Sequence, residues 1–215
     1  MHFWDRFGGW WGGYSRQPTN SSHQPTTISI PSISTASSAE IATRQMDQEP
    51  LFDVVQCLPP DDDLISDARK EIQNALDKTE VFSEFGYVPL GWGSKCDELF
   101  HHGLNLSGNT LIERQCGPYS NAEKIRMVVL MSKNHRPLLN VSVGPNYVLI
   151  FRPFKDTLDS NNGFFKMRNG RCISSSQSLD CLQLDQALIL DGNVRIDYPL
   201  TGGGLCMLLA MKKKI

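Results

Sequence analysis

The sequence predicts a mostly β fold of the α+β class: an antiparallel β-sandwich or barrel preceded by one amphipathic helix and a disordered N-terminal arm. Three observations lead to this prediction. Short apolar and β-branched segments, separated by turn residues, recur through the second half of the 215-residue chain. One segment upstream of them places its apolar residues at helical spacing. The first fifty residues have the composition of a chain that does not fold.

The N-terminal arm is expected to be flexible and to end in an aromatic tip. From Gln17 to Ala39 the chain has no Asp, Glu, Lys or Arg, and Ser, Thr and Pro dominate. Such a tract cannot bury enough apolar surface to offset the entropy lost on ordering. Glycines within the first fourteen residues oppose a free-standing helix there. The side chains that this tip would offer as a membrane or partner anchor are Phe3, Trp4, Phe7, Trp10, Trp11 and Tyr14.

One amphipathic helix is predicted at about 61–82. Asp61 or Asp62 can cap its N-terminus, where acidic side chains also favour the helix dipole. Gly86 and Pro89 end the pattern. The apolar face recurs every three or four residues and comprises Leu64, Ile65, Ala68, Ile72, Ala75, Leu76 and Thr79.

A β-rich region is predicted at about 87–211, within a single folded domain at 51–215. Asn169-Gly170 and Asp191-Gly192 are strong signals for two-residue hairpin turns. No βαβ alternation is present, which excludes a parallel-sheet nucleotide-binding enzyme. The expected strands are 124–131, 138–143, 147–151, 164–167, 187–190, 194–198 and 205–211.

Charge is segregated along the chain although the formal net charge is only −2. Residues 47–98 hold 13 acidic and 4 basic residues, a net of −9, whereas residues 124–215 hold 13 basic and 6 acidic residues, a net of +7. The rest of the chain has 4 of each sign. Loops of a β domain that present the basic residues together would bind a polyanion; the alternative is that these charges are scattered or pair internally. The basic residues are Lys133, Arg136, Arg152, Lys155, Lys166, Arg168, Arg171, Lys212, Lys213 and Lys214.

No catalytic or metal-binding motif is found. Cys96 and His101 have a spacing that can chelate zinc, and His102 and Cys116 lie nearby, but a second chelating pair is missing. A nucleophilic pair of Cys116 with His101 or His135 is formally available without a family-type signature around it. We therefore predict no cofactor, no metal and no catalytic residues.

Three classes of function remain from the sequence. The first is a non-enzymatic structural or assembly protein, viral matrix-like or capsid-like, that self-associates as a homo-oligomer and binds an anionic membrane surface or a ribonucleoprotein. The second is an RNA-binding accessory protein, such as a silencing suppressor or host-interaction factor. The third is a cysteine hydrolase. The first is our prediction, with a cytoplasmic, peripheral-membrane or virion location, because the N-terminus lacks a signal peptide and no transmembrane run is present.

Overall fold

The computed structural model describes residues 51–77, 87–120, 122–131, 141–142, 145–168, 179–197, 199 and 201–214. Several predictions therefore lie outside the described residues: the arm at 1–50 with its aromatic anchor, the Asn169-Gly170 turn, and the basic residues Lys133, Arg136 and Arg171. These remain predictions.

The described chain is mostly β, as predicted, with helices inserted between its early strands. The strands are β1 (Phe52–Gln56), β2 (Tyr87–Gly91), β3 (Lys124–Met131), β4 (Val141–Ser142), β5 (Tyr147–Pro153), β6 (Leu158–Asp159), β7 (Lys166–Arg168), β8 (Cys181–Leu182), β9 (Gln186–Asp191), β10 (Arg195–Asp197) and β11 (Leu205–Lys212). The helices are α2 (Asp62–Asp77), α3 (Ser94–His101) and α4 (Thr110–Cys116).

The central element is a six-stranded antiparallel sheet with the order β1-β9-β5-β11-β3-β2. A three-stranded sheet, β4-β10-β7, and the pair β6-β8 complete the described β structure. The last strand pairs along its length with both β3 and β5, which lie far apart from it in sequence. This pairing brings the C-terminal strand to the middle of the sheet.

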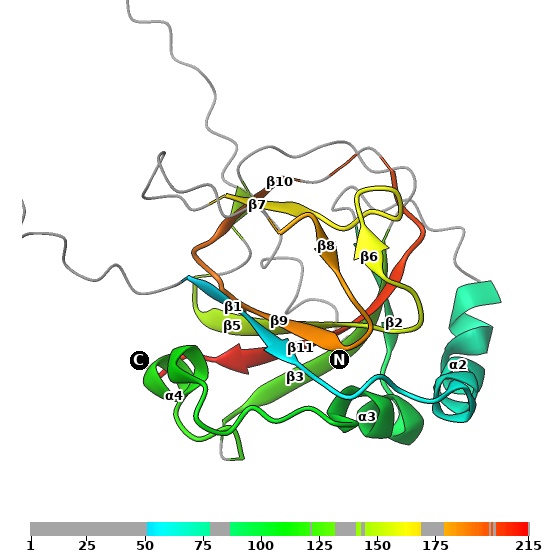
Figure 1. The fold of residues 1–215 in the computed structure, drawn as a ribbon, viewed down its shortest axis with the longest axis horizontal. Helices are drawn as coiled ribbons and strands as arrows, with labels where there is room; N and C mark the ends of the chain where they lie inside the picture. The colour runs from blue at the N-terminus through cyan, green and yellow to red at the C-terminus, as the bar shows by residue number, and fades with distance from the viewer. Residues whose placement is uncertain are drawn as a thin grey trace, which may run out of the picture. The chain divides into compact units, whose positions relative to one another are not determined.

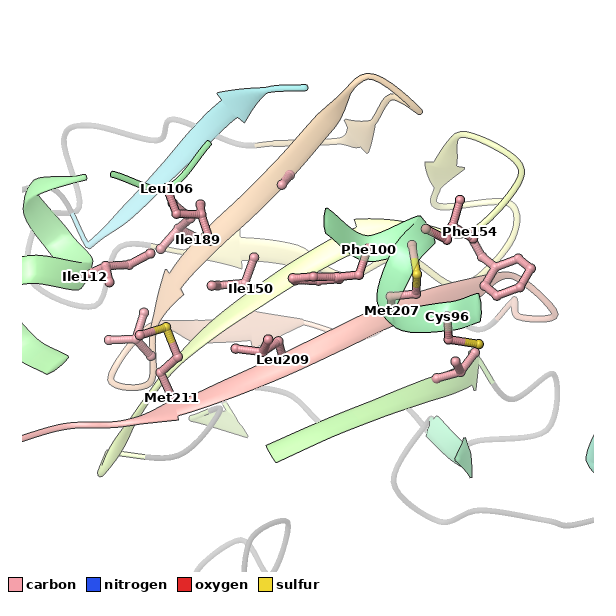
Figure 2. Packing of buried hydrophobic residues seen from close by; sticks show 14 of the residues in the cluster. Cys96, Phe100, Leu106, Ile112, Ile150, Phe154, Ile189, Met207, Leu209 and Met211 are labelled. Carbon is pink, nitrogen blue, oxygen red and sulfur yellow. The ribbon is translucent and has the colours of Figure 1, made fainter. Parts of the chain in front are cut away.

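Both faces of the six-stranded sheet are covered, which explains the nearly continuous apolar run of β5. Leu149 and Phe151 pack into a cluster that includes Met167 of β7 and Ile196 of β10. Their neighbour Ile150 instead points toward α3 and α4, because successive side chains of a strand alternate between faces. In Figure 1 the helices lie on the side of the sheet opposite to β7 and β10. The helix-side cluster shown in Figure 2 includes Cys96, Phe100, Leu106, Ile112, Ile150, Phe154, Ile189, Met207, Leu209 and Met211.

The predicted amphipathic helix is present as α2 and is capped as expected. The Leu64 N–H donates to Asp61 Oδ1 at 2.7 Å, which satisfies one of the unpaired amides at the helix start. The buried residues Ile65, Ala68 and Ile72 form its inner face. The helix therefore follows from its sequence pattern alone.

Helix α3 receives its N-terminal cap from α2 rather than from its own sequence. Its N-cap residue is Gly93, which has no side chain to accept a hydrogen bond. Instead, the Lys95 N–H donates to Glu71 Oε1 at 2.8 Å and the Cys96 N–H donates to Glu71 Oε2 at 3.0 Å. A carboxylate also complements the positive end of the helix dipole. Glu71 thus joins the two helices.

Two parts of the predicted β region differ in the structure. The segment after β2 forms α3 and α4, although we expected strands and turns from about 87 onward. The Asp191-Gly192 turn is not a hairpin, because β9 belongs to the six-stranded sheet and β10 to the three-stranded one. Gly192 does not have a positive φ. A type I′ turn requires positive φ at both of its central residues. This turn instead carries the chain from one sheet to the other.

Candidate functional site

A group of polar side chains lies where β3 extends beyond its neighbour β2. The β2–β3 pairing runs from Met131 to Val128, so the first residues of β3 lack that neighbour. Lys124 and Arg126 lie on the same sheet face as Val128, beneath α3, and alternate with Ile125 and Met127, which pack on the other face of the sheet. The group, here called the Asp97 cluster, comprises Trp92, Asp97, His101, Tyr119, Lys124 and Arg126.

Asp97 is the central acceptor of this cluster. Its Oδ1 lies 3.2 Å from Arg126 Nε and also accepts a hydrogen bond from the Trp92 indole N–H at 3.2 Å. Its Oδ2 lies 3.6 Å from His101 Nδ1, one helical turn away. The carboxylate therefore joins α3 to β3 and to the segment that enters α3.

His101 and Tyr119 form a hydrogen-bonded pair with a defined proton arrangement. His101 Nδ1 lies 2.8 Å from the Asp97 backbone carbonyl oxygen, which accepts only, so Nδ1 carries a proton. His101 Nε2 lies 2.7 Å from the Tyr119 hydroxyl oxygen. In the neutral imidazole, Nε2 is thus the acceptor and the Tyr119 hydroxyl the donor. The His101 side chain retains 34% of its exposure, so its imidazole is only partly buried.

The surroundings of Tyr119 favour its protonated form. Burial raises the pKa of the Tyr119 phenol to about 12, against an opposing influence from Arg126. The Lys124 ammonium lies 3.4 Å from the centre of the Tyr119 ring, a cation–π arrangement. Burial and the neighbouring Arg126 both lower the pKa of Lys124 from its ordinary value.

Arg152 holds the end of α3 that carries His101. Its Nη1 donates to the carbonyl oxygens of Phe100 and His102, each at 2.6 Å, and its Nη2 donates to the Leu58 carbonyl at 2.9 Å. The side chain is fully buried, and its Nε has no partner among the described residues. The guanidinium therefore serves as a buried C-terminal cap, where a cation complements the negative end of the helix.

The predicted basic surface is only partly described, and its members have different surroundings. Arg152 is not on the surface, because its buried guanidinium donates hydrogen bonds to backbone carbonyls inside the protein. Lys213 is largely buried against Asp191, at 3.0 Å. Lys166 lies 3.8 Å from Asp180 and Lys212 lies 3.4 Å from Glu123. The remaining described members with placed side chains, Lys155 and Lys214, are exposed, and Arg168 is described in its backbone only.

The residues considered for zinc or thiol chemistry are not brought together. The Cys96 thiol faces the Ala68 carbonyl and the Cys116 thiol faces the Met211 carbonyl. Burial raises the pKa of Cys96 to about 11 and also raises the pKa of Cys116. Within the described residues, no group of three or more His, Cys, Asp or Glu side chains is arranged to hold a metal ion.

Sequence reasoning missed most of the Asp97 cluster. The sequence predicts His101 only as a candidate zinc ligand or partner of a cysteine, and it predicts no functional role for Asp97, Tyr119, Lys124 or Arg126. One signal was available: Asp97 and His101 are four residues apart, the spacing that places two side chains on one helix face. Tyr119 could not be linked to them, because that contact depends on how the segment after α4 returns to α3.

Comparison with known proteins finds similarity to solved structures. No family model matches the sequence, and no curated protein matches it either. Solved structures that match the fold include HygX and a bacterial prolyl-4-hydroxylase.

Two of these structures illustrate the degree of likeness. HygX from Streptomyces hygroscopicus, solved with nickel and 2-oxoglutarate bound, has 11% sequence identity and a TM-score of 0.48, with 75% of this chain and 82% of that chain covered. A Pseudomonas putida prolyl-4-hydroxylase has 12% identity and a TM-score of 0.48, with 77% and 94% covered. At this level the comparison indicates a similar arrangement of strands and transfers no reaction to this chain.

The predicted function is corrected by these findings. HygX and the prolyl-4-hydroxylase belong to a different class of protein from the predicted non-enzymatic viral matrix-like or capsid-like protein and from its RNA-binding alternative, and neither function is proposed again. Arg152 donates to a backbone carbonyl and Lys213 pairs with Asp191. These two residues are therefore not available to the basic surface on which the assembly and RNA-binding predictions depended. Among the described helices, none has the length and apolar character needed to cross a membrane.

Proposed function

We propose that this chain is an enzyme that transfers protons through the His101–Tyr119 pair, on a β-sandwich scaffold made by its two larger sheets. The scaffold interpretation is supported by the apolar cluster that joins β5 to β7 and β10. The observation that carries the functional proposal is the hydrogen-bonded chain from the Asp97 carbonyl through His101 to the Tyr119 hydroxyl.

The chain of hydrogen bonds has the order that general acid–base catalysis requires. The Asp97 carbonyl holds Nδ1 as the protonated nitrogen, which leaves Nε2 to exchange a proton with Tyr119. A proton taken from a substrate by the Tyr119 oxygen would pass on as the phenol's own proton moves to Nε2. Because burial raises the pKa of Tyr119 to about 12, this concerted transfer avoids a free phenolate.

The neighbouring charges suit a reaction that develops negative charge on the substrate. Lys124 and Arg126 lie beside the pair, and positive groups that are already in place stabilise an anionic transition state without reorganisation. The proposal is built on these side chains alone.

Solvent proton exchange tests the proposal without knowledge of the natural substrate. The full chain is incubated in D2O with a panel of small carbonyl compounds that carry an exchangeable α-hydrogen, and deuterium incorporation is followed by NMR. We expect catalysed exchange that falls by about 100-fold or more in His101→Gln and Tyr119→Phe, the usual range for loss of a general acid–base group.

The matched control is Lys155→Gln, which removes an exposed charge outside the Asp97 cluster. This variant should exchange at the wild-type rate. Exchange that persists in both His101→Gln and Tyr119→Phe, or no exchange with any compound of the panel, would contradict the proposal.

A further inference from the structure

The Asp97 cluster contains more positive than negative charge. Lys124 and Arg126 are two residues apart on one face of β3, and Asp97 is the carboxylate that lies within ion-pairing distance of Arg126. Among the described residues, no carboxylate lies within that distance of Lys124 Nζ. The nearby Lys95 and Lys212 have their own partners, Glu98 and Glu123.

The side chain of Lys124 is placed in a way that is unusual for a surface lysine. Its side chain is half-buried, and its ammonium is placed over the Tyr119 ring instead of extending into water. Burial lowers the pKa of Lys124, with a further contribution from Arg126, so holding the two cations together has a cost in free energy. A bound anion would remove that cost.

Arg126 contacts Asp97 through one side of its guanidinium and is partly exposed. Arg126 reaches Asp97 through Nε, the inner nitrogen of its planar fork, and its side chain is 44% exposed. The terminal nitrogens of an arginine can bind a carboxylate or phosphate in bidentate fashion. Beside β3 at this point, β2 has already ended its pairing.

We infer that Lys124 and Arg126 form a subsite for a small oxyanion, so that the substrate of this enzyme carries a carboxylate or phosphate group next to the atom that exchanges its proton with Tyr119. This inference rests on the proposed function for the role of the anion as part of a substrate. The binding of the oxyanion itself depends only on the two cations and their position.

Titration of the full chain with inorganic phosphate and, separately, with succinate tests the subsite. Binding is followed by NMR through the Lys124 side chain and the Tyr119 ring at constant ionic strength. We expect saturable shifts with at least one probe, weakened about tenfold or more in Lys124→Gln, the loss typical of one charge-assisted hydrogen bond. Arg126→Lys keeps the charge but not the fork, and should weaken succinate binding more than Lys155→Gln does.

Each outcome separates this inference from the proposed function. His101→Gln should bind the probe within about twofold of the wild type, because His101 supplies proton transfer and not charge. Saturable binding that is lost in Lys124→Gln and kept in Lys155→Gln supports the subsite, even if proton exchange is never observed. Equal weakening by Lys124→Gln and Lys155→Gln shows only general screening and overturns it, as does the absence of saturation with both probes.

Discussion

Replacing Arg152 with methionine tests how the end of α3 is held. The substitution keeps a long side chain in a fully buried site but removes every hydrogen-bond donor. Three backbone carbonyls lose their partner, those of Leu58, Phe100 and His102. Two of them flank His101, so Arg152 acts as a positioning residue for the proposed site.

The size of the effect follows from how well each carbonyl can find water. Phe100 is fully buried, so its orphaned carbonyl is expected to cost about 1–3 kcal/mol. Leu58 is 62% exposed and His102 is half-buried, so loss of their bonds is expected to cost about 0.5–1.5 kcal/mol each. Removing a buried charge offsets part of this total. We expect Arg152→Met to lower the free energy of unfolding by about 2–4 kcal/mol.

Urea unfolding followed by circular dichroism measures this change, with Lys155→Met as an exposed control three residues away. Arg152→Lys is informative as well, because one ammonium cannot reproduce the fork that reaches three carbonyls, and it should be at least as destabilising as methionine. A midpoint for Arg152→Met that coincides with the wild type, at an unchanged m-value, would refute this account of how α3 is held.

Three further predictions follow from other contacts. Glu71→Ala removes the cap that α2 supplies to α3 and should lower the free energy of unfolding by about 1 kcal/mol, measured by urea titration. Burial acts to raise the pKa of Asp191, but hydrogen bonds from Asn193, Gln115 and Lys213 hold it below its ordinary value. The stability from this group is present above about pH 4 and is lost as pH falls through the lowered pKa; Asp191→Asn should therefore be less stable at pH 7 and should show a flatter acid limb in thermal unfolding. The ultraviolet difference spectrum between the wild type and Tyr119→Phe should show the phenolate of Tyr119 appearing only near pH 12, and its appearance near pH 10 would contradict the buried placement of the phenol.

Seven of the described strands were predictable, because they are short, apolar segments separated by turn residues, whereas β1, β2, β6 and β8 were not among the expected strands. The expected strand at 124–131 coincides with β3, and the last strand differs from β11 only at its final residue. The helix at 61–82 was predictable from its period and its Asp61 cap, and is described to Asp77. These features depend on neighbouring residues in the sequence.

The short helices were not predictable in the same way. Helix α3 has eight residues and an N-cap glycine, and the carboxylate that completes its first turn comes from Glu71 on another helix. Isolated helices of this length are not stable in water. The order of the strands in the sheets could not be predicted from the sequence either. The Asp191-Gly192 turn has the composition of a hairpin turn, but it connects strands of two different sheets.

The candidate site depends even more on tertiary contacts. Charge counting grouped Arg152 with exposed bases, because sequence does not distinguish a surface arginine from one that binds carbonyls in the core. Conversely, the His101–Tyr119 contact joins α3 to the segment that follows α4. No local pattern indicates such a contact.

The most direct test of the proposed site is the protonation pattern of His101, read from nitrogen-15 NMR of the imidazole ring. In the neutral state we expect the proton on Nδ1 and an unprotonated Nε2 that accepts from Tyr119, with a shift at Nε2 that changes in Tyr119→Phe. A neutral His101 that carries its proton on Nε2, or an Nε2 signal unaffected by Tyr119→Phe, would contradict the proton-transfer pair on which the proposed function rests.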